Sequence, residues 1–259
     1  MDDVVIKERA DAPEGFFEAE AAGLAWLAAA PAGAAIVPVI ESGSGRIALA
    51  RLREARPTPR QAEAFGRRLA ATHAAGAAAF GAPPDGWHGP NFIGRRPQEC
   101  RPEASWGGFF AEQRVLPFAR IARAVGDLRG GELGRVIEAC DRLRSGELDD
   151  DEAPARLHGD LWSGNVLWTA DGAVLIDPAA HGGHRESDLA MLALFGLPHL
   201  DAVLAGYDAA HPLRRGWRDR VPLHQLHPLA VHAAGHGRHY GVALAEAADA
   251  TLALPSTTG

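Results

Sequence analysis

The sequence predicts an α+β protein whose strands gather near the N-terminus and whose helices make up most of the remainder. Three short apolar stretches are typical of strands: VVIKERA (4–10), AAIVPVIES (34–42) and RIALARL (46–52). From Thr58 onward, apolar residues recur at helical spacing. We therefore expect an N-terminal part of residues 1–55, rich in strands, and a mainly helical part of residues 56–259.

The composition is that of a globular protein whose partners are not nucleic acids. The chain has 259 residues, 47% of them hydrophobic, and a formal net charge of -7. A negative chain is poorly suited to neutralise phosphates, so we expect no nucleic-acid partner. The most apolar stretch, residues 21–40, is interrupted by Pro31 and Pro38, so we expect no membrane span. Two cysteines are too few for a disulfide framework, which favours a cytoplasmic protein. The sequence does not indicate an oligomeric state.

One carboxylate of the first predicted helix lies on the apolar face of that helix. In GFFEAEAAGLAWLAAA, residues 15–30, helical spacing places Phe17, Leu24 and Leu27 on one stripe. Glu20 falls within this stripe, whereas Glu18 points away from it. Because a carboxylate on an apolar face is costly unless it has a partner, Glu20 is the acid that we expect to face inward.

Capping signals and apolar spacing place the later helices. Thr58 suits the N-cap position, with Pro59 at the first helical position and Gln61 completing a capping box. Helical patterns resume in three later stretches: residues 106–124, residues 132–143, and residue 186 onward. These signals predict that the second part of the chain is largely helical.

A β-hairpin is predicted between residues 165 and 177. The stretches NVLWT (165–169) and AVLID (173–177) flank Asp171–Gly172, a dipeptide typical of two-residue hairpin turns. The acidic run that precedes this region, residues 149–152, is expected to be a solvated loop.

The stretch RLHGDLWSGNVLW, residues 156–168, carries the strongest chemical signal of the chain. Asn165 follows Asp160 by five residues, and the hairpin brings Asp177 beside Asn165. A carboxylate and an amide oxygen suit Mg²⁺ carrying a phosphate, and Asp160 is left to accept a proton or orient a nucleophile. With His158, this is the order of a kinase catalytic loop. Taken singly, an Asp that caps a turn and an Asn in a left-handed conformation would explain the same residues.

LHGDLWSGNVLW followed by VLIDPAAHGGHRESDLAMLALFG resembles the fructosamine-3-kinase family. That family is a branch of the aminoglycoside phosphotransferase and choline kinase group. Trp162, two residues after the Asp, and the segment GHRESDLAM are specific to it, and weaker similarity extends over nearly the whole chain. The resemblance implies a protein-kinase-like two-lobe fold, here with an abridged N-terminal β lobe and a mainly helical C-terminal lobe.

The resemblance also assigns the nucleotide-binding residues. It makes Lys7 the lysine that holds the α- and β-phosphates of ATP, paired with the helix acid Glu20, with Glu18 as the alternative. Of 26 basic residues Lys7 is the one lysine, and a compact ammonium suits a phosphate better than a guanidinium does. ATP is expected between the lobes, near the segment after the third strand: Ala50, Arg51, Leu52 and Arg53.

The chain departs from the family pattern in two places. Only six residues precede Lys7 and none is glycine, so we expect the hairpin with a glycine-rich turn that covers the ATP phosphates to be missing. Its loss would reduce activity. Smaller departures at Pro90, Cys100 and His181 make substrate preference less predictable than reaction type.

On the acceptor side, the resemblance points to an aromatic and a histidine. Trp162 would stack on a sugar, although an indole buried under the loop is the alternative. His232 would help to line the acceptor pocket, although a packed core histidine explains it as well. His232 and His236, at helical spacing, could instead share a zinc ion, although the glycines beside His236 weaken that helix.

Together these features predict a kinase that uses ATP and Mg²⁺. The resemblance implies that its acceptor is the 3-hydroxyl of a ketoamine, a fructosamine or ribulosamine, so that the reaction would reverse glycation. One alternative is a kinase of another small alcohol, such as an aminoglycoside or an amino alcohol. A second is a non-catalytic protein that binds a nucleotide or ketoamine, suggested by the absent loop.

Overall fold

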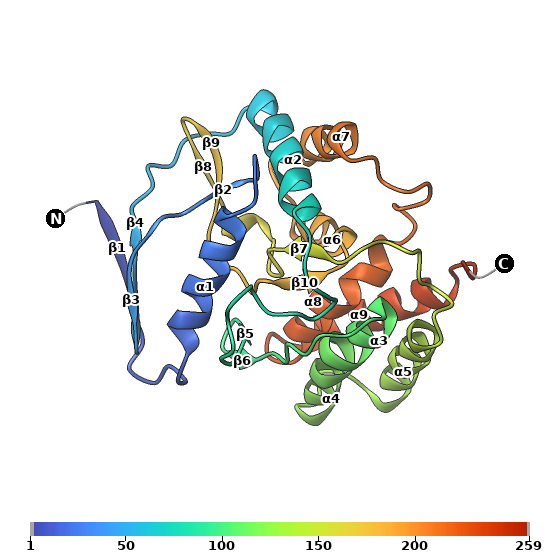
Figure 1. Ribbon diagram of the computed structural model, residues 1–259. Helices are drawn as coiled ribbons and strands as arrows, with labels where there is room; N and C mark the ends of the chain where they lie inside the picture. The colour runs from blue at the N-terminus through green and yellow to red at the C-terminus, as the bar shows by residue number, and fades with distance from the viewer. Residues whose placement is uncertain (1–2, 258–259) are drawn as a thin grey trace.

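A three-stranded antiparallel sheet and one helix form the N-terminal part of the protein. The computed structural model describes residues 3–257. The sheet has the strand order β1-β4-β3, and helix α1 packs against it (Figure 1). The elements are β1 (Val4–Glu8), α1 (Phe16–Ala28), β3 (Val39–Gly43) and β4 (Arg46–Ala50). Phe17 and Leu24 of α1 are buried with Ile47 and Leu49 of β4, so these two residues of the predicted apolar stripe pack on the sheet, whereas Leu27 is buried beside Ala180.

The predicted strand of residues 34–42 is divided at Pro38, and its two halves join different sheets. β2 (Ala35–Ile36) pairs in parallel with β9, whereas β3 pairs with β4. The prediction of one strand over residues 34–42 is therefore wrong for the residues before Pro38. Proline lacks the N–H needed to continue a strand ladder, so the chain changes partner at this position. Because β2 belongs to the sheet of a later hairpin, a boundary at residue 55 stays a prediction.

The predicted hairpin is present and lies between the N-terminal sheet and the helices. β8 (Val166–Thr169) pairs antiparallel with β9 (Gly172–Leu175) as predicted, although the two turn residues are Ala170 and Asp171, and Gly172 already belongs to β9. A second short pair, β7 (Ala155–Leu157) with β10 (His181–Gly183), brackets the same segment. The residues from 158 to 180 therefore leave one small sheet, form the hairpin and return beside their starting point.

Helices pack around this segment and form the main core (Figure 1). The Thr58 cap, Pro59 and the Gln61 capping box begin α2 as predicted. A π-helix at Phe110–Val115 interrupts the predicted helix of residues 106–124. The remaining elements are α2 (Pro59–Ala74), β5 (Phe92–Ile93), β6 (Arg96–Pro97), α3 (Trp106–Phe109), α4 (Leu116–Ala124), α5 (Gly130–Arg144), α6 (Glu186–Phe195), α7 (Leu200–Ala210), α8 (Val221–Ala233) and α9 (Arg238–Leu252).

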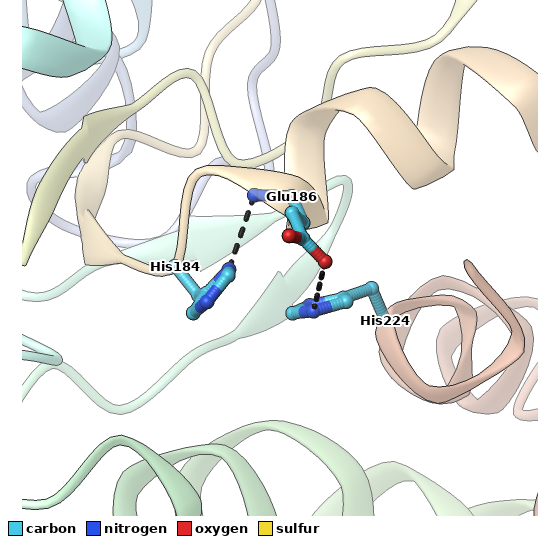
Figure 2. A group of neighbouring side chains, drawn as sticks. All are labelled: His184, Glu186 and His224. Atoms are coloured by element: carbon cyan, nitrogen blue, oxygen red, sulfur yellow. Dashed lines mark hydrogen bonds and ion pairs between the residues drawn. The ribbon is translucent and has the colours of Figure 1, made fainter. Parts of the chain in front are cut away.

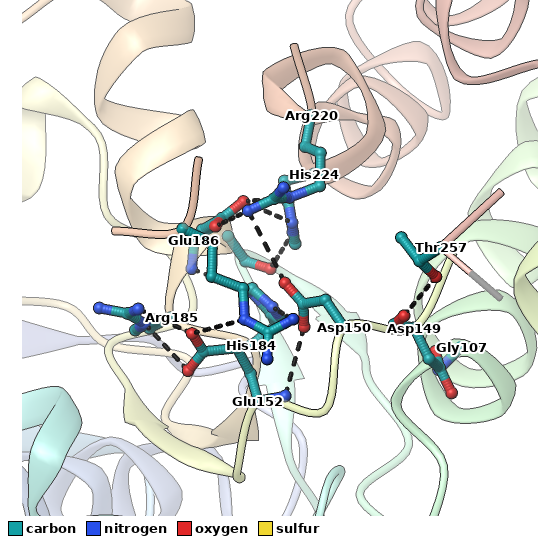
Figure 3. A network of polar contacts seen from close by, with 12 residues as sticks. Gly107, Asp149, Asp150, Glu152, His184, Arg185, Glu186, Arg220, His224 and Thr257 are labelled. Carbon is teal, nitrogen blue, oxygen red and sulfur yellow. Dashed lines mark hydrogen bonds and ion pairs between the residues drawn. The ribbon is translucent and has the colours of Figure 1, made fainter. Parts of the chain in front are cut away.

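The acidic run of residues 149–152 is not the solvated loop that we predicted. Asp150 is buried, and its Oδ1 lies 3.1 Å from Nε2 of His184. Glu152 accepts a hydrogen bond of 2.7 Å from Nη2 of Arg185 (Figure 3). Two of the four acids therefore hold α6 and the residues before it against the rest of the helical part. Their partners lie more than 30 positions away in the sequence, where local charge patterns do not reveal them.

Within the described residues, the structure contains no helix that is both long and apolar enough to span a membrane.

Candidate active site

The loop after β7 is held in place by a buried carboxylate. Asp188 of α6 accepts hydrogen bonds from the backbone N–H groups of His158, at 2.8 Å, and Gly159, at 3.0 Å. His73 of α2 contacts the same carboxylate at 3.2 Å. Burial alone would raise the pKa of Asp188, but these donors outweigh it and lower that pKa. The loop thus presents its next residue, Asp160, from a fixed position.

Asp160 lies in surroundings that disfavour its charge. Burial raises the pKa of its carboxyl to about 7, and the nearby carboxylates of Asp177 and Asp188 act in the same direction. Asn165 opposes them, because its Nδ2 donates to Oδ2 of Asp160 over 3.1 Å. A carboxylate that titrates near neutral pH can accept a proton from a hydroxyl group and release it again.

Asn165 and Asp177 lie side by side, as the predicted hairpin required. Nδ2 of Asn165 donates to the backbone oxygens of Asp160, at 2.7 Å, and of Asp177, at 3.4 Å. Because the nitrogen makes these contacts, the amide oxygen is the atom left to bind a cation. Asp177 has a φ of 54°, uncommon for a residue other than glycine, and its carboxylate is 42% exposed. An amide oxygen and an exposed carboxylate form a donor set that fits Mg²⁺.

Lys7 faces this pair from the N-terminal sheet. Its Nζ lies 2.6 Å from Oε1 of Glu20 and also donates to Oδ1 of Asp177. Burial opposes the ammonium, but the two carboxylates outweigh this effect and raise the pKa of Lys7. Burial also raises the pKa of Glu20, against the pull of Lys7. The acid that pairs with the lysine is therefore Glu20 and not Glu18.

These side chains line one cleft of about 520 Å³. Lys7, Glu20, Asp160, Asn165 and Asp177 all contribute to its walls. Trp162 lines it as well and is 40% exposed, so the alternative of an indole buried beneath the loop is wrong. A Cβ at Gly164 would collide with the Trp162 ring, which therefore rests on the backbone of that glycine.

Two groups of predicted site residues do not line this cleft. Ala50 ends β4, and the segment after it bonds to the residue before β1: the backbone N–H of Arg51 donates to the oxygen of Asp3 at 2.8 Å. The nucleotide role of this segment stays a prediction for all four residues: Ala50, Arg51, Leu52 and Arg53. His232 packs between the rings of Phe195 and Tyr240, and its Nδ1 lies 2.7 Å from the oxygen of Pro228. Together with Asp160 it borders a small cavity of about 10 Å³, and its substrate role stays a prediction.

A group of three residues that could hold a metal ion lies elsewhere, and not at His232 and His236. Within the described residues this group is His184, Glu186 and His224, all buried (Figure 2). Nδ1 of His184 accepts from the backbone N–H of Glu186 at 3.2 Å, and Nε2 of His224 lies 3.4 Å from the Glu186 carboxylate. Nε of Arg220 donates to that same carboxylate at 3.0 Å. Because protein groups already satisfy these atoms and a guanidinium stands beside them, the cluster is a structural network.

Some cleft residues were not predicted as site residues. Asn91 precedes β5, Phe92 begins it, and both line the cleft. Phe16 of α1 packs on Phe92 with ring centroids 5.1 Å apart. Their signal in the sequence was an amide and aromatic residues within a segment rich in glycine and proline, residues 85–94, where NFIG also carries part of the weaker family similarity. Such a segment is typical of an ordinary loop, so its place in the cleft depends on tertiary structure.

The fold and this cleft define a phosphotransferase of the protein-kinase-like class that acts on an alcohol group. An aminoglycoside phosphotransferase, APH(4)-Ia, solved in a ternary complex with AMP-PNP and hygromycin B, has the same fold. It superposes with a TM-score of 0.60 at 16% identity, covering 96% of this chain and 84% of that one. The predicted α+β, protein-kinase-like fold is thereby confirmed.

Within this class, the chain belongs to the fructosamine kinase family, whose model matches residues 1–253. A "probable ketoamine kinase" of Thermus thermophilus is 35% identical over 248 residues, which are 95% of this chain and 87% of that protein. The crystal structure of a "putative fructosamine-3-kinase" from Thermobifida fusca is 47% identical. It superposes with a TM-score of 0.90, covering 97% of this chain and 86% of that one.

Proposed function

We propose that this protein uses ATP and Mg²⁺ to phosphorylate the 3-hydroxyl of a ketoamine, a fructosamine or ribulosamine. The family membership and the names of the relatives support a ketoamine as the acceptor. One observation carries the proposal: Asp160, Asn165 and Asp177 meet Lys7 in a single cleft. A phosphorylated ketoamine is more labile than its parent, so the reaction would serve to reverse glycation.

Each residue of the cleft has a distinct task in this reaction. Lys7, held by Glu20, binds oxygens of the triphosphate, and Asn165 with Asp177 would hold Mg²⁺. When bound, the ion supplies positive charge against the phosphates. Asp160 accepts the proton of the acceptor hydroxyl as its oxygen bonds to the γ-phosphorus and the bond from phosphorus to ADP breaks. Catalysis here consists mainly of positioning and charge neutralisation.

Trp162 gives the acceptor its binding surface. The indole lies within the cleft two residues beyond Asp160, where a sugar can place its C–H face on the ring. The amine of a ketoamine is positively charged at neutral pH and gains cation–π attraction at the same ring. An aminated sugar is therefore favoured over a neutral one. A cytoplasmic setting is supported by the two cysteines, Cys100 and Cys140, which are both free thiols.

A substrate panel tests the proposal. The full chain is incubated with Mg·ATP and a fructosamine, a ribulosamine, an aminoglycoside or an amino alcohol, and ADP release is measured. We expect turnover with a ketoamine that disappears on chelation of Mg²⁺. Turnover of the amino alcohol or aminoglycoside alone would replace the proposed acceptor. Binding of Mg·ATP and ketoamine in a calorimeter without any turnover would instead indicate a binding protein.

A further inference from the structure

Asp177 has a backbone conformation that its surroundings must hold in place. Residues other than glycine rarely adopt a φ of 54°, and such a conformation persists only where neighbouring contacts fix it. The carboxylate that would bind Mg²⁺ therefore depends on the segment that carries it, residues 176–181, which we call the Asp177 segment. Two buried histidines bond to the backbone of this segment, one before Asp177 and one after it.

His158 holds the backbone before Asp177. Its Nδ1 accepts from the backbone N–H of Asp160 at 3.3 Å, so the ring proton lies on Nε2. Nε2 donates to the backbone oxygen of Ile176 at 2.8 Å. This histidine thus ties the residue before Asp177 to the catalytic loop.

His181 holds the backbone after Asp177. Its Nδ1 lies 2.8 Å from the backbone oxygen of Ala179, to which it donates. The N–H of Ala179 in turn donates to the backbone oxygen of His158 at 3.0 Å. A Cβ at Gly159 would collide with the Ala179 oxygen and with the His181 ring. This end of the Asp177 segment therefore rests directly on the backbone of the catalytic loop.

Arg114 decides which nitrogen of His181 is the donor. This arginine is fully buried, and its Nε donates to Nε2 of His181 at 3.3 Å. Because a guanidinium can only donate, Nε2 must be an acceptor and the ring proton must lie on Nδ1, the atom that faces Ala179. Burial and the neighbouring guanidinium also lower the pKa of His181 well below its usual value, so the ring stays neutral and keeps this tautomer.

The other contacts of Arg114 leave this task as its distinctive one. Its Nη1 donates to the backbone oxygens of Glu99 and Gln113, at 2.6 and 3.1 Å, and its Nη2 donates to Sγ of Cys100 at 3.4 Å. None of these acceptors is a carboxylate, so the arginine does not complete an ion pair with them. A buried cation is costly, and what it supplies here that an apolar side chain could not is a donor to His181.

We propose that His181 is a positioning residue for the phosphoryl transfer: with its tautomer set by Arg114, it holds the backbone after Asp177 so that this carboxylate can bind Mg²⁺. The inference rests on the proposed function, because it takes Asn165 and Asp177 to be the magnesium ligands. His181 acts through the backbone of Ala179 and not by contact with the ion. Its loss should therefore weaken the binding of Mg²⁺ and leave the binding of the nucleotide itself unchanged.

A thermodynamic cycle with ADP tests this role. The dissociation constant of ADP is measured by calorimetry with Mg²⁺ and with a chelator in its place, and the ratio of the two constants gives the contribution of the metal. The ratio is determined for the parent, for His181→Phe and for His224→Phe. His224 is a matched control, because it is also a buried histidine and its polar contacts with Glu186 and Ser187 lie outside the Asp177 segment.

We expect the metal contribution to fall about tenfold in His181→Phe and to stay within about a factor of two of the parent in His224→Phe. Phenylalanine keeps a ring beside Phe109, whose centroid lies 5.7 Å from that of His181, but it donates nothing to Ala179. The affinity for ADP in the chelator should be the same in all three proteins.

His181→Asn separates the hydrogen bond from the volume of the ring. Nδ2 of an asparagine lies as many bonds from Cα as Nδ1 of a histidine, and an amide needs no partner to fix its donor. This variant should keep the metal contribution within about threefold of the parent, because it can still donate to Ala179. It decides the question by itself if His181→Phe does not fold.

Three results would overturn the positioning role, and a fourth is distinguishable from them. The metal contribution could be unchanged in a folded His181→Phe, could fall equally in His224→Phe, or could be lost in His181→Asn. Each of these would mean that His181 serves the fold alone. If Mg²⁺ does not tighten the binding of ADP to the parent, the proposed metal role of Asp177 fails, and the positioning role fails with it.

Discussion

Two parts of the molecule concentrate ionisable side chains, and they use them in opposite ways. The network around α6 joins Asp150, Glu152 and Glu186 to His184, Arg185 and Arg220 (Figure 3). The cleft joins Lys7 and Glu20 to Asp160 and Asp177. In the network each acid meets a cation or an imidazole within the protein. In the cleft, Lys7 is the one cation within hydrogen-bonding distance of these acids among the described residues.

Protonation reflects this difference. Burial on its own would raise the pKa of the carboxyl groups in both places. In the network, His224 and Arg220 outweigh the effect of burial and lower the pKa of Glu186 to about 2. Asp160 has only an amide donor and stands near other carboxylates, and its pKa rises to about 7. Density of charged residues therefore does not identify the reactive site. The reactive site is identified by a buried carboxylate that has no cation beside it among the described residues, as is the case for Asp160.

Asp160→Asn should give the largest effect, and that effect should appear in the reaction rate and not as a loss of stability. Removal of the proton acceptor is expected to lower kcat by about 10³-fold. The pKa of Asp160 is higher in the folded state than in the unfolded state. Its contribution to the free energy of unfolding is therefore fully present at a pH below the unfolded-state pKa and is lost as the pH rises through 7. The variant should thus be at least as stable as the parent at pH 8. Activity within tenfold of the parent would show that Asp160 is not the base.

Asp150→Ala should show the reverse pattern. Removing this acid leaves His184 without its carboxylate and takes one of two carboxylates from Arg220, and we expect unfolding to become easier by about 3 kcal/mol. Below the unfolding transition, kcat should stay within a factor of two. Glu246→Ala, at an exposed position of α9, is the control and should shift stability by less than about 0.5 kcal/mol. Denaturant titrations and initial rates together measure both quantities.

The reaction rate and the stability should depend on pH in different ways, because the cleft controls the first and the network around α6 the second. Asp160 must be ionised to accept a proton, so the rate should rise with pH through about 7. Burial lowers the pKa of His224 to about 4, and its neutral form is therefore the folded form. Between pH 6.5 and 4 the unfolded chain takes up a proton at His224 and the folded protein does not. The contribution of this group to the free energy of unfolding is therefore present above pH 6.5 and is lost as the pH falls toward 4. A rate profile and an unfolding profile that coincide at every pH would contradict this separation.

The smallest expected effect concerns the N-terminal end of α2, which supplies no residue to either region. Thr58→Ala removes the N-cap of α2, whose side chain accepts from the N–H of Gln61 at 3.3 Å. We expect unfolding to become easier by about 1 kcal/mol, with kcat unchanged. Thermal unfolding measures the first quantity and steady-state rates the second. A loss of activity at full stability would indicate that α2 has a role in the cleft.

The parts of the structure that short-range patterns determine were predicted from the sequence. Such patterns place the Thr58 cap, the hairpin after Asn165 and the inward-facing Glu20. The cleft followed because a hairpin must bring its two ends together, and the chain spacing between Asn165 and Asp177 allowed that hairpin.

The features that depend on distant partners could not be predicted. Asp150 has the same local surroundings as a solvated acid, and only His184 and Arg220 make it a buried one. Gln98 and Gln113 are equivalent in the sequence, yet one carboxamide has its partners and the other does not. Pro38 interrupts the predicted strand of residues 34–42, but the sequence does not show which sheet receives the residues before it.

The contact between Trp162 and Gly164 has a consequence for how tightly an acceptor can be held. The glycine backbone supports one side of the indole, so the ring stands in place before any sugar arrives. A binding surface that is already rigid loses little conformational freedom when it is occupied, and more of the stacking energy is left to appear as affinity. Gly164 thereby reduces the conformational entropy that the Trp162 side chain loses when an acceptor binds.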